Sequence, residues 1–273
     1  MKHLVVVGRA LLAALLLHLG PAYAGRACGE PQPMTVTTVE RSLNLAMRTL
    51  QALDQSGAKV VILARAGQDL SKYGLRYSHF GFAYQQPDDR GGHVWRVLHK
   101  LNQCGTAEAD IYRQGLGEFF LDDLWQYEAA WVVPTSAVQD KLLALLRDES
   151  RAVRLHQKPY SMVSYTWGSK YQQSNQWATE TMALALSEDL STVGNPTRQQ
   201  AQSWLLLKGF QPSALNIGAL TRLGARVTAA NVAFDDHPNE KRYADRIETT
   251  TVDSVFAWML RAGLATQPVV TLR

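Results

Sequence analysis

Cysteine is scarce in this chain of 273 residues, which contains only Cys28 and Cys104. Neither begins a predicted helix and neither sits beside a cation, so neither has the surroundings that lower a thiol pKa and create a nucleophile. Any chemistry that depends on an activated thiol is therefore absent from the sequence pattern.

Long hydrophobic runs are also missing, apart from residues 10–19, which are too few to span a bilayer. Lys2 and Arg9 lie before this run, and Ala22-Tyr23-Ala24 follows it with small residues at both positions that signal peptidase reads. We expect a signal peptide over residues 1–24 and a periplasmic or secreted protein with no stable membrane span after cleavage. A retained anchor is the alternative.

Both cysteines lie in the predicted mature chain. An even number of cysteines in an exported protein favours a Cys28–Cys104 disulfide. In the chain-entropy model, closing a loop of that length stabilises the fold by about 4 kcal/mol. Two unpaired structural thiols are the alternative.

Charge and short motifs exclude several classes of function. The chain has 28 Lys and Arg against 24 Asp and Glu, and no basic cluster with interleaved aromatics, so we expect no nucleic-acid partner. It lacks a phosphate-binding loop, a Gly-x-Ser-x-Gly elbow and a zinc motif, so we predict no cofactor and no metal. Asp235-Asp236-His237 is read as a turn before Pro238, because adjacent residues rarely share one ion.

No repeat, low-complexity tract or Pro/Gly-rich linker divides the chain, so residues 25–273 are predicted to form a single domain. β-branched and alternating patterns predict strands at 59–64, 77–84, 93–101, 127–133 and 161–167. Helical spacing predicts helices at 37–53, 175–186, 197–208, 212–223 and 252–262, and a capping box from Ser136 to Gln139 starts another. Strands in the first half and helices in the second favour an α+β fold with an antiparallel sheet.

His79 is the strongest candidate for chemistry. Alternation within 77–84 places it on one strand face with Gly81, whose missing side chain leaves room for another chain or a substrate. Imidazole titrates near neutrality and can act as a general base. The alternative is a buried histidine bonded to a backbone carbonyl.

His99 is the candidate that would orient His79, since the third member of a catalytic triad holds the base in one tautomer. His93 shares the strand face of His99 and is a rival, and Asn102 at the strand end also stays open.

Ser174 lies where a loop turns into a helix, within Gln173-Ser174-Asn175-Gln176-Trp177. Free N–H groups at a helix N-terminus stabilise an oxyanion, which makes Ser174 a candidate nucleophile. Serine is also among the best N-cap residues, so a purely structural cap is the alternative. The aromatic residues around this segment line a cleft for glycan or acyl groups or else pack in the core; they are Tyr160, Tyr165, Trp167, Tyr171 and Trp177.

These segments resemble the circularly permuted branch of the papain-like superfamily, which includes NlpC-type peptidases and lecithin-retinol acyltransferase-like proteins. Ser78-His79-Phe80-Gly81-Phe82 is similar to the strand that carries the base, and Val97-Leu98-His99-Lys100 resembles the strand that carries the orienting residue. Ser174 stands where that superfamily has its cysteine. From about Cys28 to the C-terminus, the chain also resembles an uncharacterised family of exported bacterial proteins, a domain of unknown function.

The resemblance implies a permuted papain-like core with additional C-terminal helices. It also implies a hydrolase or acyltransferase acting on an amide or ester, with a cell-envelope peptide, glycan or acyl group as substrate. His79 would then be the base, His99 the orienting residue and Ser174 the nucleophile. A catalytically inactive papain-like binding module is the alternative, because serine replaces cysteine. The sequence leaves the oligomeric state open.

Overall fold

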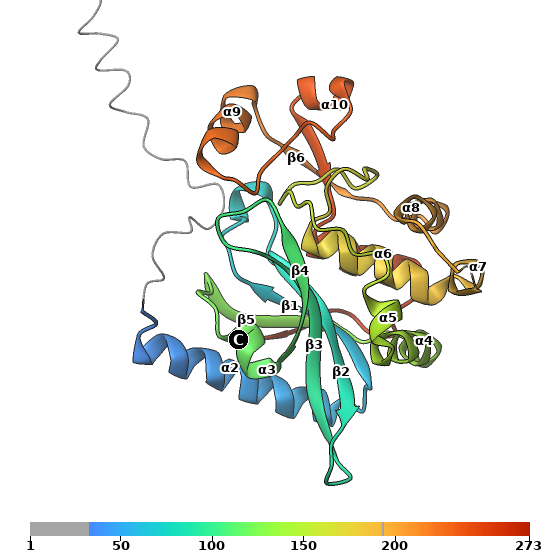
Figure 1. Ribbon diagram of the computed structural model, residues 1–273. Helices are drawn as coiled ribbons and strands as arrows, with labels where there is room; N and C mark the ends of the chain where they lie inside the picture. Colours follow the sequence, from blue (N-terminus) through green and yellow to red (C-terminus); the bar gives the residue numbers. More distant parts are fainter. Residues whose placement is uncertain (1–32, 193) are drawn as a thin grey trace, which may run out of the picture.

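A six-stranded antiparallel sheet forms the centre of the protein, whose computed structural model describes residues 33–192 and 194–273. The strand order is β4-β3-β2-β1-β5-β8 (Figure 1). The strands are β1 (Val60–Ala66), β2 (His79–Pro87), β3 (His93–Asn102), β4 (Ala109–Gly115), β5 (Gln126–Val132) and β8 (Val270–Leu272). Strands β1 to β4 follow one another in space as in sequence, as antiparallel neighbours with short connections do.

Helices α2 (Val36–Gln55) and α3 (Leu116–Phe120) cover one face of this sheet (Figure 1). The side chain of Thr35 caps α2 by accepting a hydrogen bond from Thr38 N. The buried residues of this face come from both helices and from the odd-numbered positions of β1, β2 and β3: Leu45, Leu53, Val61, Leu63, Ala83, Trp95, Val97, Phe119 and Phe120.

The opposite face carries the larger helical layer. Its helices are α4 (Ser136–Arg147), α5 (Glu149–Ala152), α6 (Ser174–Leu186), α7 (Glu188–Thr192), α8 (Arg198–Leu207) and α11 (Val252–Arg261). Phe80 and Phe82 of β2 point toward this layer, and the Phe82 ring meets the Trp177 ring of α6 edge-on. β1 is buried along its whole length because both of its faces are covered.

A smaller unit at one end of the molecule pairs β6 (Ser213–Asn216) with β7 (Arg246–Thr249), and α9 (Ala219–Thr228) and α10 (Asn239–Tyr243) flank them (Figure 1, top). Its apolar centre is made by Leu215, Ile217, Ala225, Val232, Phe234 and Ile247. A one-turn 3-10 helix, η1 (Ser71–Tyr73), lies in the β1–β2 connection, and Tyr73 and Leu75 of that connection pack against the same centre.

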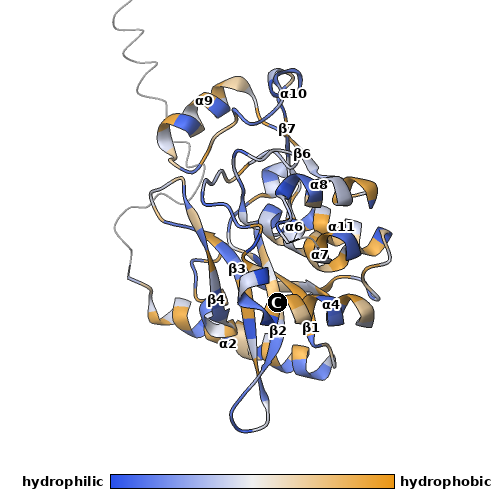
Figure 2. Cartoon of the chain, turned by 45° about the vertical axis from the view of Figure 1, so that its right-hand side comes forward, coloured by the Kyte–Doolittle hydropathy of each residue, from blue (hydrophilic) through white to orange (hydrophobic). Residues whose placement is uncertain are grey.

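The hydropathy of the chain follows these layers, since hydrophobic residues concentrate on the strands and on the helix faces turned toward them, while the β2–β3 hairpin tip is hydrophilic (Figure 2). Within residues 33–192 and 194–273, no helix combines the length and the apolar character needed to cross a bilayer.

The α+β class with an antiparallel sheet is confirmed. The predicted strands at 59–64, 77–84, 93–101 and 127–133 correspond to β1, β2, β3 and β5. The helices predicted at 37–53, 175–186, 197–208 and 252–262 correspond to α2, α6, α8 and α11. Segments that are long or have a strong hydrophobic pattern therefore form the helices and strands that their own sequence predicts.

Two predicted elements are wrong. Residues 161–167 form no strand, because side chains of α6 hold this segment as a series of turns: Gln176 Nε2 donates to the carbonyls of Tyr165 and Thr166. Residues 212–223 are divided between β6 and the first half of α9, because β6 pairs with β7 about thirty residues later.

Thr135, not Ser136, caps α4, and the Gln139 amide oxygen accepts from the backbone of Lys59 and Val60.

Candidate functional site

The site begins where β2 and β3 separate. Their paired register runs from Pro87↔His93 to Phe82↔Leu98 and stops there, although β3 continues to pair with β4 as far as Asn102. The first turn of α6 fills the opening. Asn175 Oδ1 accepts from Phe80 N at 3.2 Å and its Nδ2 donates to Ser78 O at 3.3 Å, so one side chain replaces the strand partner on both sides of His79.

His79 and His99 lie on the face of the sheet that α2 and α3 cover. His79 Nε2 and His99 Nδ1 are 2.8 Å apart, and His99 Nε2 lies 2.8 Å from Gln114 Oε1 on β4. Both imidazole rings also contact the Phe119 ring. The sequence-predicted pairing of these two histidines is therefore present as a direct hydrogen bond.

The hydrogen bonds determine the tautomers. Gln114 Oε1 can only accept, so His99 Nε2 donates, and the remaining nitrogen of neutral His99 accepts from His79 Nε2. His79 Nδ1 is then left with a lone pair. Within the described residues, His79 Nδ1 is not one of the fully buried nitrogens that lack a partner. His79 lines a cavity and keeps 9 % of its surface exposed. An unprotonated imidazole nitrogen thus reaches the cavity.

Burial keeps both histidines neutral. It holds the pKa of His79 well below the ordinary 6.5, with a further lowering from the Arg65 guanidinium and then from His99. Burial, followed by Arg65, lowers the pKa of His99 to about 3. Arg65 is the register partner of His79 on β1, and its own charge is balanced by Asp122 at 2.7 Å. His79 is therefore neutral at neutral pH and can accept a proton, as a weaker base than a free imidazole.

Gly81 allows β3 to approach β2 this closely. A Cβ at this position would lie 2.7 Å from Val97 Cγ1, 2.9 Å from His99 Cβ and 3.0 Å from the Leu98 carbonyl oxygen. The space beside Gly81 is thus filled by β3 of the same chain. We had expected that space to receive another chain or a substrate, and this expectation is wrong.

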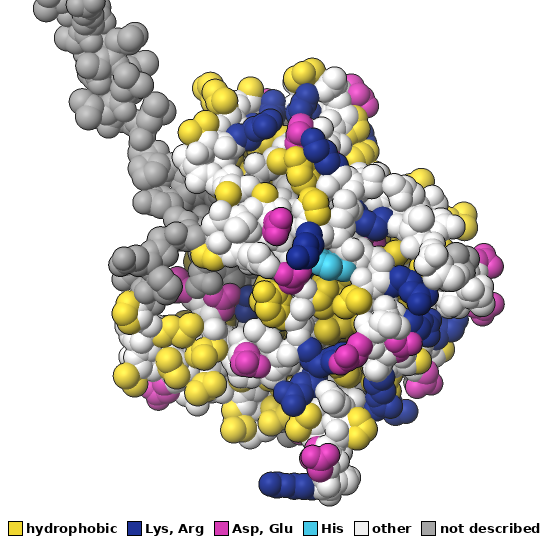
Figure 3. Space-filling model, in the orientation of Figure 1, with side chains coloured by type: hydrophobic (Ala, Val, Ile, Leu, Met, Phe, Trp, Pro, Cys, Tyr) yellow, Lys and Arg dark blue, Asp and Glu magenta, His cyan; other side chains and the backbone are white. Residues whose placement is uncertain are grey.

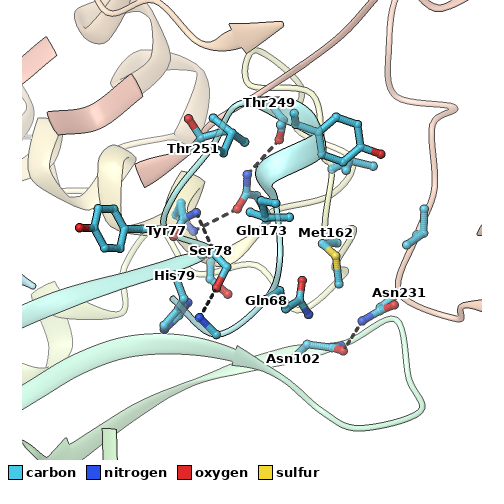
Figure 4. Close-up of a pocket in the computed structure, with 18 of the residues that line it drawn as sticks. Gln68, Tyr77, Ser78, His79, Asn102, Met162, Gln173, Asn231, Thr249 and Thr251 are labelled. Atoms are coloured by element: carbon cyan, nitrogen blue, oxygen red, sulfur yellow. Dashed lines mark hydrogen bonds between the residues drawn. The ribbon is translucent and has the colours of Figure 1, made fainter. Parts of the chain in front are cut away.

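The cavity has a volume of about 740 Å³ and lies between the end of the main sheet and the smaller β6–β7 unit. In Figure 4, Gln68, His79 and Asn102 lie on the sheet side, and Gln173, Thr249 and Thr251 lie on the other. Apolar and aromatic side chains complete the lining: Leu70, Tyr73, Leu75, Tyr77, Trp125, Tyr160, Met162, Val163, Ile217 and Phe234. Apolar walls with a few convergent polar groups are typical of small-molecule sites.

Ser174 lines the same cavity as His79. It is not the helix cap, because Gln173 has extended backbone angles and its side chain accepts from Asn175 N, which makes Ser174 the first residue of α6. The structural role that serine most often has at a helix start therefore belongs to its neighbour. Burial raises the pKa of Tyr160, and the nearby Ser174 side chain offsets part of this rise.

The relation of Ser174 to the histidines differs from expectation. We expected α6 to point its N-terminus at the face that carries His79 and His99. The body of α6 packs on the other face, and only its first turn reaches the end of β2 through Asn175. No hydrogen bond joins Ser174 to His79 in the described part of the chain.

The other sequence candidates lie in different surroundings. His93 is exposed near the hairpin and bonds to Asp54 of α2 at 3.1 Å, far along β3 from His99. The Asn102 side chain donates to the carbonyls of Thr106 and Glu108 and accepts from Asn231 at 2.8 Å, so it shapes the cavity wall and does not contact His79.

No cluster of three His, Cys, Asp or Glu side chains able to hold a metal occurs within the described ranges. His237 Nε2 instead donates to the carbonyl of Val163, and Asp236 accepts from Tyr165 N. Of the five candidate cleft aromatics, Tyr160 lines the cavity and Trp177 is buried in the core.

Gln114, Asn175 and Arg65 were not predicted from the sequence. Gln114 belongs to β4, whose polar sequence gives no strand pattern. The position of Asn175 as a strand substitute depends on a contact across 95 residues. Of these three residues, only Arg65 has a sequence feature that could have marked it as part of the site: it is a charged residue directly after an apolar strand run.

Cys104 also lines the cavity, while Cys28 and the predicted signal peptide at 1–24 lie outside the described residues. The disulfide and the processing site therefore stay predictions.

A sequence model for a family described as "Uncharacterized protein conserved in bacteria (DUF2145)" matches residues 52–259. The chain belongs to this family. The matched range contains His79, His99 and Gln114, which are joined by hydrogen bonds, and also Ser174. No curated protein and no solved structure matches the chain.

Proposed function

We propose that this protein is an exported hydrolase or acyltransferase that acts on an amide or ester, with a circularly permuted papain-like core. One observation carries the proposal: the chain of hydrogen bonds from Gln114 through His99 to His79 leaves His79 Nδ1 free to accept a proton in a cavity that Ser174 also lines. An oriented base and a serine hydroxyl that line one cavity are two of the groups that nucleophilic catalysis uses.

In the proposed reaction, Ser174 Oγ gives its proton to His79 Nδ1 and attacks the carbonyl carbon of the substrate. The oxygen of that carbonyl gains negative charge, which the positive end of α6 stabilises. His79 then returns the proton to the leaving alcohol or amine, and an acyl group remains on Ser174. Water or a second alcohol or amine removes this acyl group by the same steps. His99 and Gln114 hold the tautomer of His79 throughout.

The second candidate is a binding module that keeps the cavity without the reaction. The position of Ser174 near Tyr160, together with the absence of a hydrogen bond between Ser174 and His79 in residues 33–192 and 194–273, favours it. For that module, the lining predicts a small ligand with apolar and hydroxyl or amide groups, such as an envelope peptide, glycan or acyl chain.

The test replaces Ser174 with cysteine, whose thiol pKa can be measured from its labelling rate. In Ser174→Cys, the helix N-terminus and transfer of the thiol proton to His79 should lower the apparent thiol pKa by at least one unit from the free value of about 8.5. Ser136→Cys is the matched control, because Ser136 is also the first residue of a helix but is exposed and has no histidine partner. The measurement is the rate of iodoacetamide labelling against pH, with the modified residue identified by peptide mass.

Three further variants complete the experiment. Adding His79→Ala to Ser174→Cys should return the pKa toward that of the Ser136→Cys thiol. If Ser174→Cys titrates like the control with or without His79, no working pair exists and the hydrolase proposal fails. Loss of ester or amide cleavage in Ser174→Ala and His79→Ala then separates enzyme from binding module.

Purifying the protein from the exported fraction and measuring its intact mass tests the predicted signal-peptide cleavage before Gly25.

A further inference from the structure

Helix α9 has its apolar side turned outward. Leu220, Leu223 and Val227 are 86 %, 62 % and 79 % exposed, and their spacing places them in one stripe along the helix. The buried residues of α9, Arg222 and Ala225, lie on the opposite side. A surface helix ordinarily shows its polar side to water, so this outward stripe of Leu220, Leu223 and Val227 (the α9 stripe) is unusual.

The exposed cation beside the stripe is Arg226, and α9 has no acidic residue. Arg222 is buried on the opposite side and pairs with Asp245, and Lys241 of α10 pairs with Glu248. Arg226 is exposed and forms no ion pair within the described ranges. Figure 3 shows hydrophobic and Lys or Arg side chains together on the tip formed by α9 and α10. Tyr243 on α10 adds an aromatic ring that is 71 % exposed.

We propose that the α9 stripe docks this protein onto an anionic lipid surface. A helix with aliphatic residues on its outer face and cations beside them is the pattern of an interfacial helix, whose apolar side enters the headgroup region while its cations meet lipid phosphates. Tyr243 of α10 is exposed as well, and tyrosine is a residue type that suits the boundary between lipid and water.

The shape and size of the patch favour lipid over a second protein. A stable protein–protein interface uses about 20–30 residues on each side, whereas this patch consists of three aliphatic side chains and one tyrosine on a projecting tip. A lipid surface needs no complementary shape. Thr221 and Ala225 of the same helix line the 740 Å³ cavity, so docking would place α9 between the lipid and that cavity.

The experiment is amide hydrogen exchange of the full chain, read by peptide mass, with and without vesicles. The vesicles are phosphatidylglycerol with phosphatidylcholine, or phosphatidylcholine alone. With the anionic vesicles, peptides from residues 219–228 should exchange at least fivefold more slowly, and the effect should shrink with phosphatidylcholine alone and in Arg226→Glu. Because exchange is read locally, attachment through another part of the chain is not mistaken for docking by α9.

The decisive variant is Leu220→Gln, Leu223→Gln and Val227→Gln combined, in which the protection of 219–228 should disappear. The matched control is Leu206→Gln with Leu207→Gln on α8, two leucines as exposed as those of the stripe, and it should keep the protection. All of these side chains are exposed, so the variants should melt within a few degrees of the unaltered protein.

Protection that persists in the stripe variant, or that is absent with anionic vesicles, would overturn the proposal. So would protection of 219–228 that rises with protein concentration in the absence of vesicles, since a second copy would then cover the stripe. The hydrolase proposal depends on His79 and Ser174 and stands or falls separately.

Discussion

At the scale of single residues, the site depends on how closely two strands approach. Gly81 lets His99 come within hydrogen-bonding distance of His79, because any side chain at position 81 would overlap Val97, His99 and the Leu98 carbonyl. The same burial that follows from this close packing keeps both imidazoles uncharged. One missing side chain therefore determines both the geometry and the protonation of the base.

Gly81→Ala tests this dependence. The added methyl group forces β3 away from β2, so we expect a loss of about 1–3 kcal/mol in the free energy of unfolding, measured by urea denaturation. The His79–His99 distance should lengthen, which would raise the thiol pKa in the Ser174→Cys background. Gly224→Ala is the control, since a Cβ there meets nothing within 4 Å inside helix α9, and it should be neutral or stabilising by up to about 1 kcal/mol. Equal behaviour of the two variants would contradict the role of Gly81.

At the scale of elements, α6 organises the site. Residues 174–185 are all buried, polar ones included, and Gln176 among them donates to the carbonyls of Tyr165 and Thr166 in the irregular segment that precedes the helix. Glu180 at the centre accepts from Gln172, Arg198 and Gln202, and Arg198 in turn donates to the carbonyls of Gly168 and Ser169. This network holds the segment that leads into Ser174, and Asn175 anchors the first turn of the helix to β2.

Asn175→Ala tests the anchoring of that turn. It removes two hydrogen bonds and leaves the buried Phe80 N–H without a partner, so we expect a loss of about 1–3 kcal/mol in stability. Amide exchange should become faster at residues 78–81 and stay unchanged in the hairpin between β2 and β3. The control is Asn44→Ala, which changes an exposed asparagine on α2 and should alter stability by less than about 0.5 kcal/mol. Unchanged exchange at 78–81 would show that β2 does not need the helix.

At the scale of the whole molecule, long-range contacts join the chain end to the site. Glu128 of β5 is buried and accepts from Arg76 and Tyr77 in the β1–β2 connection and from Arg273, the last residue. Burial opposes ionisation, but the hydrogen bonds from Arg76, Tyr77 and Arg273 outweigh it and lower the pKa of Glu128 to about 2. The carboxylate thus fastens the C-terminus and the segment before His79 to the same strand.

Glu128→Gln should therefore destabilise the protein in a pH-dependent way. A carboxyl group with a folded-state pKa of about 2 and an ordinary pKa of 4.5 stabilises the fold above pH 4.5, and this contribution is lost as the pH falls toward 2. Because Arg76 is partly exposed and Arg273 is mostly exposed, we expect a loss of about 2 kcal/mol at pH 7.

The measurement is urea unfolding at several pH values between 3 and 7. The difference between the variant and the unaltered protein should shrink steadily below pH 4.5. Glu149→Gln, which removes an exposed partner of Arg113, should cost less than about 0.5 kcal/mol at any of these values. A Glu128→Gln effect that is independent of pH would mean that Glu128 acts by packing and not by charge.

The sequence by itself determined the α+β class, the four strands with strong apolar patterns and the long helices. Hydrophobic periodicity and β-branched runs are local properties, so they are readable without the fold. The same local alternation placed His79 and His99 on one face of neighbouring strands, and the hydrogen bond between them confirms that placement. The loop-to-helix transition near Ser174 was also local, to within one residue of the cap.

Only the tertiary structure decided the rest. β4 and β7 have polar sequences and exist because a neighbouring strand supplies their hydrogen bonds, and residues 161–167 lose their strand to the side chains of α6. Gln114, Asn175 and the cavity arise from residues brought together across long stretches of chain, and the face on which α6 packs follows from which apolar surfaces meet. Such contacts leave no periodic trace in the sequence, because their free energy comes from pairs of residues and not from any one segment.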